Sequence, residues 1–432
     1  MSERNKSLIF TLLLFYVLFP FSFARIHVLQ DLLNLGISFL IIVFNLSFLE
    51  EKVQIFKPKL LSTFLLVALV GMWSLLLPMV YRTFDYSYFM VVVFSAVQQL
   101  LKFMAVMIIY LRLFKEKATF SRYALFYIVS CCLYFSLTIL FILSPGLKEM
   151  WLGNLYISDL DIMQLQKPQY VTRIGIDGFA GFGQTFKFSI GIMLSVFLIA
   201  KNFVSNKLRS IFLMAAILIL LLGTLFYGRI GSVAGFIGIL VLVLYFFNYQ
   251  RTLKIGLTFI GVCFILFLLV IVASLFNNAI MVWLEWAFEL IITFINTGRF
   301  SSASTDILFE RMYFIPDLKS VLFGNALYTD PTGGYFMGTD VGILRNILFF
   351  GILPTILVYL VIAISLNGIG NQLSNYGRVG KILLRLLIIT FLLFEFKGSI
   401  YQAYFPILVP FYGILLFEKN NERIGAGKKL SP

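Results

Sequence analysis

Charged side chains are scarce in this sequence. Only 12% of its 432 residues are Asp, Glu, Lys or Arg, whereas 60% are hydrophobic and the mean hydropathy is +0.97. A soluble domain carries roughly 25% charged residues, so this chain cannot cover a water-exposed surface of that kind. The shortage of charge excludes a soluble globular protein and indicates one that lies largely in lipid.

Cysteine and histidine are also rare, with three residues and one residue respectively. Cys131 and Cys132 are adjacent within one apolar run and Cys263 lies in another, so the spacing indicates neither a disulfide framework nor a metal site. The single histidine, His27, follows Arg25 at the end of an apolar run. That position is typical of a residue that anchors a helix at the membrane interface.

One acidic pair has the composition of a metal ligand set. Asp159 and Asp161 form an Asp-x-Asp motif, and two carboxylates can bind a divalent cation through their oxygen atoms. Such short acidic motifs are also common in solvated loops, and we favour that interpretation. We therefore predict no metal site and no cofactor.

Apolar runs, by contrast, fill most of the chain. A helix needs about 20 apolar residues to cross roughly 30 Å of hydrocarbon, and backbone groups in lipid must be satisfied within the segment, which favours helices. We predict an all-α, polytopic integral membrane protein with about 12 transmembrane helices, forming a single domain over residues 1–432. The predicted spans are 7–24, 28–49, 60–80, 89–111, 123–143, 183–200, 210–227, 231–249, 255–276, 341–366, 382–398 and 402–417.

The distribution of charge predicts the orientation. If the N-terminus is cytoplasmic and the spans alternate, the inside segments hold 21 cations and 6 acids, a net of +15, and the remainder holds 13 cations and 14 acids, a net of −1. This asymmetry follows the positive-inside rule. It predicts that both termini are cytoplasmic, and it explains the basic composition without a nucleic-acid partner. Residues 1–24 also resemble a secretory signal, but their long, Phe-rich run favours a first span that stays in the protein.

Two long segments, 144–182 and 277–339, are predicted on the outer face. Long loops on a rigid scaffold often carry function. The second begins with MVWLEWAFELIITFINTG, in which Glu285 and Glu289 lie one helical turn apart, and this pattern favours an amphipathic helix in the membrane interface over a thirteenth span. A further short helix is expected to end near Gly324.

Several arginines are predicted at the outer face, against the positive-inside trend. Arg229 is the only charged residue between Arg209 and Arg251, and glycines surround it, which we expect to permit a turn and the close approach of a ligand. Guanidinium groups suit phosphate oxygens, whereas anchoring in the interface or pairing with a loop carboxylate is the alternative role. The candidate set is Arg173, Arg229, Arg299, Arg311 and Arg345.

The pattern of spans and loops resembles bacterial O-antigen polymerases of the Wzy type, which are related to O-antigen ligases. The resemblance covers the hydropathy of nearly the whole chain, and its local motifs are GRIGS within 228–235 and TGRFSSASTDILFERMYFIPDLKSVLFGNALY and GTDVGILRNILFFGIL within 298–352. The chain departs from the Arg-x10-Gly spacing of some members, because Arg173 and Arg311 precede glycines at other distances. Ligases of the related type use a loop histidine, and the position of His27 outside both loops favours a polymerase.

The resemblance implies a GT-C-like architecture in the bacterial inner (cytoplasmic) membrane. It implies transfer of a glycan from an undecaprenyl-pyrophosphate-linked oligosaccharide to another lipid-linked repeat unit on the periplasmic face, within surface polysaccharide or lipopolysaccharide biosynthesis. Membrane lipid and a chain-length regulator are the other partners that it implies. The arginines would bind the pyrophosphate, and a carboxylate would accept the proton of the attacking hydroxyl. The candidate bases are Asp177, Asp306, Glu310 and Asp340.

Three other functions stay open at this point. An O-antigen ligase or another lipid-linked glycosyltransferase would use similar residues. A lipid-linked oligosaccharide flippase or transporter would account for the ionisable residues Asp31, Lys102 and Glu395 within spans, but transporters usually show matching halves and short loops. A purely structural membrane protein is the last alternative.

Overall fold

The fold of the chain is almost entirely helical, as the sequence predicts. The structure is a computed structural model that describes residues 1–167, 170, 172–202, 207–246, 278–299, 301–331 and 333–428. The one sheet among these residues is an antiparallel pair, β1 (Ile174–Gly175) and β2 (Gly178–Phe179), in which Ile174 faces Phe179. The all-α class is therefore confirmed.

Six helical segments in the described part of the chain are long and apolar enough to cross a membrane, or seven if one bent pair counts as a single span. The bent pair is His27–Val43 with Leu46–Val53, and Arg229–Leu244 is a shorter apolar helix. The predicted span 255–276 lies outside the described residues. A membrane protein is thus supported, while the number of twelve and the GT-C-like architecture stay predictions. The six segments are Pro58–Tyr81, Phe89–Lys117, Phe120–Leu143, Phe182–Lys201, Arg209–Tyr227 and Ile352–Lys397.

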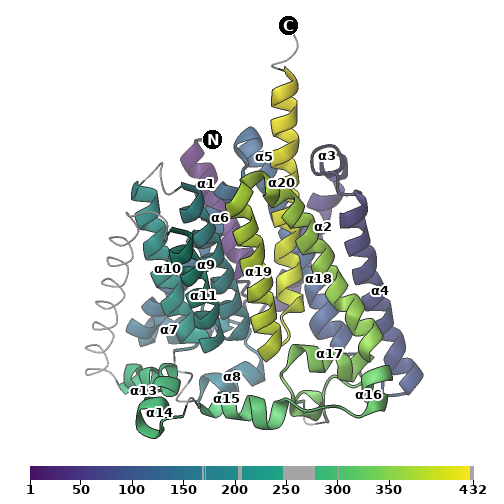
Figure 1. Cartoon of the computed structure of the whole chain (residues 1–432), viewed down its shortest axis with the longest axis vertical. Coiled ribbons are helices and arrows are strands. Elements are labelled where there is room, and N and C mark those ends of the chain that lie inside the picture. The colour runs from purple at the N-terminus through teal and green to yellow at the C-terminus, as the bar shows by residue number, and fades with distance from the viewer. Residues whose placement is uncertain are drawn as a thin grey trace. The chain divides into compact units, whose positions relative to one another are not determined.

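The described residues divide into two compact units, each of which is built around its own packed helices. Unit 1 comprises Met1–Leu32, Ser121–Ser302 and Arg385–Thr390. Within it α9 packs against both α10 and α11, and α13 contacts α10 (Figure 1). Its helices are α1 (Glu3–Leu18), α6 (Phe120–Leu143), α7 (Pro145–Leu152), α8 (Asp159–Leu165), α9 (Phe182–Asn202), α10 (Lys207–Tyr227), α11 (Arg229–Phe246), α13 (Asn278–Ala287) and α14 (Glu289–Thr297).

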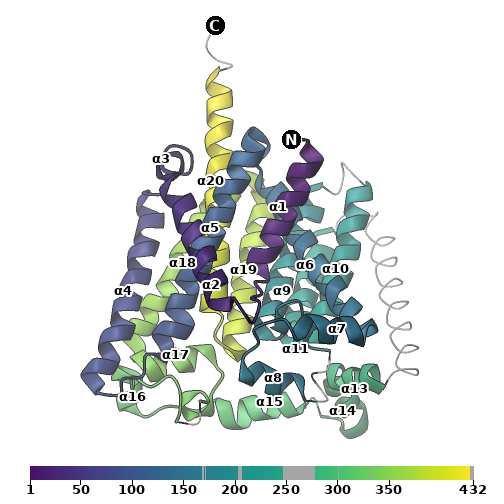
Figure 2. The same ribbon diagram turned by 180° about the vertical axis from the view of Figure 1, so that it is seen from behind.

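Unit 2 comprises Leu33–Phe120, Ala303–Leu384 and Phe391–Pro432. Here α20 packs against α5 and α18, and α18 packs against α4 (Figure 2). The unit contains most of α2 (His27–Val43) and of α19 (Gly377–Lys397). Its other helices are α3 (Leu46–Phe48), η1 (Leu49–Val53), α4 (Pro58–Tyr81), η2 (Phe89–Phe94), α5 (Ser95–Phe114), η3 (Lys115–Lys117), α15 (Ala303–Ile307), η5 (Leu308–Met312), α16 (Leu318–Phe323), η6 (Phe336–Gly338), α17 (Gly342–Phe350), α18 (Ile352–Leu373), η7 (Ser374–Tyr376) and α20 (Tyr401–Lys428).

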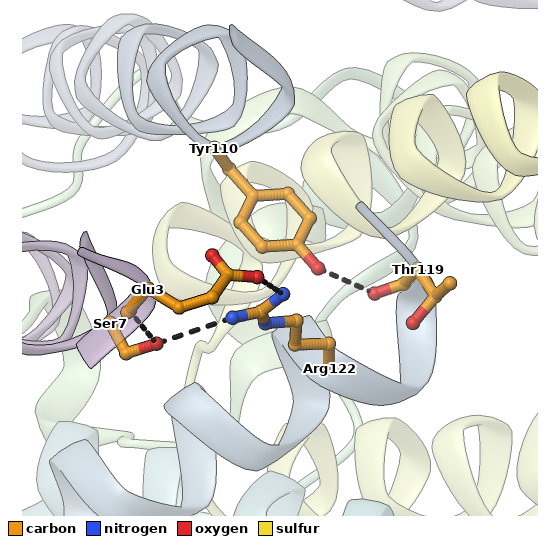
Figure 3. A network of polar contacts seen from close by, with 5 residues as sticks. All are labelled: Glu3, Ser7, Tyr110, Thr119 and Arg122. Carbon is orange, nitrogen blue, oxygen red and sulfur yellow. Dashed lines mark hydrogen bonds and ion pairs between the residues drawn. The ribbon is translucent and has the colours of Figure 1, made fainter. Parts of the chain in front are cut away.

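Helix α1 is packed into unit 1, since Phe10, Leu14 and Leu18 are fully buried. Arg122, at the start of α6, donates hydrogen bonds to Glu3 and Ser7 of α1, each at 3.2 Å (Figure 3). The predicted topology puts Glu3 and Arg122 on the same, cytoplasmic side, and this contact requires that they share a side. That the first span stays in the protein is still a prediction.

The predicted tenth span, 341–366, is wrong as a single helix. Gly351 separates α17 from α18 with a φ of +80°, a conformation that side chains rarely adopt. A Cβ atom at Gly351 would lie 2.5 Å from the carbonyl oxygen of Leu322, and one at Gly324 would lie 2.3 Å from that of Phe349. Because both positions are glycine, the backbone after α16 can lie in direct contact with the backbone at the end of α17. Figure 1 shows α16 and α17 next to each other.

The second predicted outer segment contains more breaks than expected. The helix expected around Glu285 and Glu289 consists of two helices, α13 and α14, which meet at Phe288 with a φ of −104°. The short helix expected to end near Gly324 is confirmed, because α16 ends at Phe323 and Gly324 follows with a φ of +73°. The position of α13 and α14 in the interface stays a prediction.

The predicted topology can be tested by labelling introduced cysteines. Ser158 and Pro331 are exposed in the two predicted outer segments, and Glu116 is exposed in a predicted inner one. We expect Ser158→Cys and Pro331→Cys to react with an impermeant maleimide in intact spheroplasts, and Glu116→Cys to react only after lysis. If both outer cysteines reacted only after lysis, the predicted orientation would be wrong.

Candidate functional site

The five predicted arginines do not form one group within either unit. Arg173 and Arg229 lie in unit 1, where each guanidinium approaches the ring of Trp286, at 4.8 and 4.9 Å. Arg345 lies in unit 2 on α17. Two arginines are solvent-exposed and lie in neither arrangement: Arg299, after α14, and Arg311, in η5.

Arg229 is the first residue of α11, and Gly228 alone separates it from α10. Its Nη1 donates to Oε2 of Glu289 at 2.8 Å, with side-chain exposures of 11% and 28%. Part of the positive charge is therefore already matched by a carboxylate 60 residues further along the chain. The turn predicted around Arg229 is confirmed, and Arg229 also makes the kind of ion pair with a loop carboxylate that was the alternative role.

The glycines after Arg229 allow helices to pack closely, which differs from the predicted ligand approach. A Cβ atom at Gly231 would lie 2.9 Å from Cγ2 of Thr224, and one at Gly235 would lie 2.4 Å from Cδ2 of Leu221. Both contacts are with α10. Small residues four apart let two helix backbones approach each other, which is a common interface in membrane bundles.

Arg173 precedes β1 and is enclosed by aromatic rings. Its guanidinium carbon lies 4.1 Å from the ring centre of Tyr170 and 4.8 Å from that of Trp286, within the range of cation–π attraction. Its Nε atom is buried and has no hydrogen-bond partner in the part of the chain that the structure describes. Burial lowers the pKa of Arg173, the charge of Arg229 lowers it further, and Tyr170 opposes both. An anion beside the two guanidiniums would relieve this mutual repulsion.

Arg345 is the most enclosed of the candidate cations. The residue is 7% exposed, and its guanidinium carbon lies 3.5 Å from the ring centre of Tyr335 and 4.2 Å from that of Tyr328. Nε and Nη2 are both buried and neither has a hydrogen-bond partner among the described residues. A buried donor without a partner costs about 1–3 kcal/mol, and more when the group is charged. The arrangement is that of a site which a ligand anion completes.

The two tyrosines differ in their exposure to solvent. Tyr328 is 2% exposed, whereas Tyr335 is 41% exposed, so Tyr335 forms the solvent-facing wall of the Arg345 site. Tyr328 is held in place by Asp85, whose Oδ2 accepts from the backbone N–H groups of Tyr328 at 2.6 Å and Thr329 at 3.0 Å. Burial raises the pKa of Asp85, but hydrogen bonds from Ser87, Thr329 and Tyr328 outweigh it and lower the pKa overall.

A chain of hydrogen bonds fixes the helix that carries Arg345. The Tyr88 hydroxyl donates to Oδ1 of Asn346 at 2.9 Å, and Nδ2 of Asn346 donates to the Tyr359 hydroxyl at 3.0 Å. Tyr359 in turn donates to Oε1 of Glu395 at 2.8 Å, and Oε2 of Glu395 accepts from the Ile400 N–H at 3.0 Å. Glu395, which the sequence marked as an ionisable residue inside a span, therefore joins the α19–α20 junction to α17 and α18.

The candidate bases have very different surroundings. Both oxygens of Asp177 are occupied, one by the Tyr134 hydroxyl and the other by the amide of Gln184 at 2.8 Å. Burial raises the pKa of Asp177, although Lys187 and these hydrogen bonds oppose the rise. Glu310 is exposed in η5, and Asp306 is half-buried in α15. None of these three is placed at Arg345 by a described contact.

Among the four candidate bases, Asp340 is the one whose charge interacts with that of Arg345. It lies two residues before α17, and its side chain is open to solvent. The surrounding protein raises its pKa by partial burial, while the positive charges of Arg345 and Lys397 oppose that rise without cancelling it. The hydroxyl of the preceding Thr339 donates to the Met312 carbonyl at 2.9 Å and so restrains this turn. Asp340 thus combines solvent access with proximity to the buried cation.

The Asp159–Asp161 motif forms the first turn of α8. Oγ of Ser158 accepts from the Asp161 N–H at 3.2 Å and donates to its Oδ2 at 2.8 Å, which is an N-terminal capping arrangement. Acidic residues in a first turn also suit the helix dipole. No group of three or more His, Cys, Asp or Glu side chains capable of holding a metal occurs among the described residues. The expected lack of a cofactor stays a prediction.

The packing role of the glycines gives a test on stability. Gly231→Ala and Gly235→Ala should lower the thermal unfolding temperature, because overpacking of a tight contact typically costs about 1–3 kcal/mol. Gly36→Ala is the matched control, since a Cβ atom there meets nothing within 4 Å. If both variants had the wild-type unfolding temperature in detergent, close helix packing would not explain these glycines, and the predicted role in letting a ligand approach would be favoured.

No protein-family model, curated protein or solved structure matches this chain. The resemblance to O-antigen polymerases consequently stays a prediction from the residues. The function has to be argued from the chemistry of the Arg173–Arg229 site and of the Arg345 site. Arg345 has more buried nitrogen atoms without a hydrogen-bond partner among the described residues than Arg173 has.

Proposed function

We propose that the protein is a surface polysaccharide (O-antigen) polymerase that joins undecaprenyl-pyrophosphate-linked repeat units at the periplasmic face of the inner membrane. The observation that supports this most is the Arg345 guanidinium, which is buried, aromatic-walled and without partners on two of its nitrogen atoms. Arginine is suited to phosphate because its planar donors match two oxygens at once. A pyrophosphate is the anion that the proposed reaction places in such a site.

The proposed reaction is a glycosyl transfer. A sugar hydroxyl of one lipid-linked unit attacks the anomeric carbon of the other, a new glycosidic C–O bond forms, and the C–O bond to undecaprenyl pyrophosphate breaks. Negative charge grows on the leaving pyrophosphate in the transition state, where a preorganised guanidinium stabilises it. Because Nε and Nη2 of Arg345 have no partner to give up, they are available for that charge without rearrangement.

Asp340 is the proposed proton acceptor. The hydroxyl proton has to leave as the new bond forms, and a carboxylate with a raised pKa accepts a proton more readily than an ordinary one. Asp340 has such a pKa and is open to a substrate from solvent. By contrast, a substrate hydroxyl could reach Asp177 only by displacing Tyr134 or Gln184.

Arg173 and Arg229 keep their proposed role as further pyrophosphate contacts, on unit 1. Trp286 lies against both, and Glu289 neutralises part of the charge of Arg229. Arg173 is the stronger contact of the two in this proposal, because its Nε is buried and unpartnered. Arg299 and Arg311 contribute only a general positive potential, since both are exposed.

The surroundings of His27 favour the polymerase over a ligase within the proposal. Its ring stacks on Tyr156 at 3.9 Å with an angle of 4° between the rings, and Nδ1 lies 3.0 Å from the Ala24 carbonyl. These contacts suit an anchoring residue. A ligase of the related type would need a histidine in one of the two long loops, and the chain has none there.

Substitution of Arg345 should lower the polymerisation rate without lowering the stability of the protein. Arg345→Met should lower the polymerisation rate about 10- to 150-fold, because a charge-assisted hydrogen bond is worth about 1.5–3 kcal/mol and each 1.36 kcal/mol changes a rate about tenfold. The same variant should keep or raise the unfolding temperature, since it removes two buried donors that have no hydrogen-bond partner among the described residues. The measurement is the ladder of glycan lengths made by purified protein from lipid-linked repeat units, with thermal unfolding of the same samples.

Arg112→Met provides the matched control, because Arg112 lies in the same unit at a predicted inner position and pairs with Asn45. It should give a wild-type ladder. Arg345→Lys should be intermediate, since it keeps the charge and loses the planar fork. A wild-type ladder from Arg345→Met would remove the main support for the proposed function.

The pH dependence tests the proposed base. The rate should fall as the pH drops through the pKa of Asp340, and this limb should lie at higher pH than for an ordinary carboxylate because that pKa is raised. Asp340→Asn should lose the limb and lower the rate about 10²- to 10⁴-fold. The measurement is kcat/KM against pH. Glu310→Gln is the competing variant, and a larger loss there would transfer the role of base to Glu310.

A further inference from the structure

A buried carboxylate lies beside the helix that carries Arg345. Glu395, near the end of α19, is 4% exposed. A Cβ atom placed on Gly342, the first residue of α17, would lie 2.3 Å from Oε1 of Glu395, so glycine alone fits at this position. Gly342 and Arg345 are three residues apart, and residues at that spacing lie on the same side of an α-helix. The carboxylate therefore lies against α17 on the side that carries Arg345.

Glu395 and Arg345 interact through their charges, while the hydrogen bonds of the carboxylate go to other groups. Oε1 of Glu395 accepts from the Tyr359 hydroxyl, and Oε2 accepts from the Ile400 N–H. Nε and Nη2 of Arg345 have no partner among the described residues. The charge of Arg345 nevertheless acts on Glu395, and attraction to a nearby cation favours an ionised carboxylate. The donors of Arg345 thus stay available for a ligand that would compete with Glu395 for the same positive charge.

The other ionisable groups around Glu395 are mostly tyrosines. The groups on its own helix and on the neighbouring segments are Lys397, Tyr401, Arg345, Tyr88, Tyr328 and Tyr359. Tyrosine is neutral near neutral pH, because its hydroxyl ordinarily ionises near pH 10, and arginine and lysine are positive there. Asp340, two residues before α17, also interacts with the charge of Arg345. Among these groups, Glu395 and Asp340 are therefore the two that can change charge when an anion reaches Arg345.

The hydrogen-bond partners of Glu395 can accommodate either form of its carboxyl group. In the ionised form both oxygens accept, one from Tyr359 and one from the Ile400 N–H. In the protonated form the O–H group can donate to the Tyr359 hydroxyl oxygen, because a hydroxyl both donates and accepts. The other oxygen can still accept from Ile400. A proton can therefore bind at Glu395 with the same two partners and without a shift of a neighbouring helix.

We infer that Glu395 is a proton-binding site linked to the anion site at Arg345, so that a bound anion is accompanied by a proton taken up at Glu395. The inference rests on the proposed function, because it takes Arg345 as the pyrophosphate site, and it adds the regulation of that site by pH. Without ligand, the carboxylate partly balances the guanidinium. A bound pyrophosphate repels the carboxylate and so favours its protonated form. Linkage is reciprocal, and a lower pH therefore strengthens anion binding.

Substitution of Glu395 should remove the proton linkage and retain the anion site. Glu395→Gln has the charge of the protonated form, so it should bind inorganic pyrophosphate more tightly than wild type at the alkaline end of a pH series. The expected difference there is about 5- to 150-fold, which is the usual range for coupled sites. At the acidic end, where Glu395 of wild type is protonated, the two affinities should converge. The measurement is the Kd of purified protein by titration calorimetry at each pH.

Calorimetry in buffers of different ionisation enthalpy also counts the protons that bind with each pyrophosphate. Wild type should take up more protons than Glu395→Gln, by as much as about one per site. The proton change of pyrophosphate itself is common to both proteins and cancels in this difference. Glu418→Gln is the matched control and should behave as wild type. Glu418, in a predicted inner segment, likewise accepts from a tyrosine hydroxyl, that of Tyr376 at 2.8 Å, and from a backbone N–H, that of Phe120 at 2.9 Å.

Thermal unfolding checks that Glu395→Gln is folded. If it is not, Tyr359→Phe tests the linkage, because loss of the hydroxyl that donates to Oε1 disfavours the ionised carboxylate. The pH at which pyrophosphate affinity changes should then be higher than in wild type, and an unchanged pH would count against the inference. In wild-type protein, infrared difference spectra should show a protonated carboxyl band that appears with pyrophosphate and is missing in Arg345→Met.

The outcomes distinguish failure of the linkage from failure of the polymerase. Equal affinities and proton counts for wild type and Glu395→Gln at every pH would overturn the inference and leave the polymerase proposal standing. A linkage that is lost in Asp340→Asn and kept in Glu395→Gln would also overturn it, since the proton would then bind at Asp340. Pyrophosphate binding that is unchanged in Arg345→Met, or absent in wild type, would remove the anion site and the inference with it. A Glu395-dependent linkage in a protein that does not polymerise would support the inference and remove the proposed reaction.

Discussion

Backbone hydrogen bonding in an apolar environment is the constraint on which the rest of this structure depends. The C-terminal end of each helix leaves carbonyl groups that have to find donors. At the end of α17 the carbonyls of Leu348 and Phe349 accept from the N–H groups of Asn325 at 2.7 Å and Ala326 at 3.1 Å. These two hydrogen bonds let the helix break at Gly351 while the carbonyls of Leu348 and Phe349 stay paired. The break makes α17 a separate short helix, and Arg345 is carried by that helix rather than by a continuous span.

The same constraint gives the two arginine sites different chemistry. Arg229 begins a helix and finds a carboxylate in the next long segment, so its charge is largely balanced inside the protein. Arg345 lies against the rings of Tyr328 and Tyr335, and the buried carboxylate of Glu395, whose charge also acts on it, is already bonded to Tyr359 and the Ile400 N–H. Buried guanidinium donors without hydrogen-bond partners lower stability, and such donors are expected where a ligand supplies the missing acceptors.

The sequence predicts those structural features that depend on neighbouring residues, and it does not predict contacts between residues that are far apart in the chain. Hydropathy predicts the long helices because their stability depends on residues within one segment, and the Gly324 stop was found for the same reason. The ion pair of Arg229 with Glu289 spans 60 residues, and the contact of Asp85 with Tyr328 spans 243. No periodicity in one chain signals such pairs. The break at Gly351 was missed because glycine also occurs within continuous transmembrane helices, so a lone glycine in an apolar run does not by itself indicate a helix end.

The candidate set from the sequence could not be ordered by residue type alone. Five arginines and four carboxylates share the same chemistry, and only burial and hydrogen bonding distinguish Arg345 from Arg311 or Asp340 from Asp177. Within unit 2 this ordering combines the buried Arg345 with the solvent-accessible Asp340, whose carboxylate feels the charge of that guanidinium. A guanidinium alone would bind any anion, and a carboxylate alone could accept any proton. Their proximity at the start of one helix is what favours a reaction in which an anionic group leaves while a hydroxyl loses its proton.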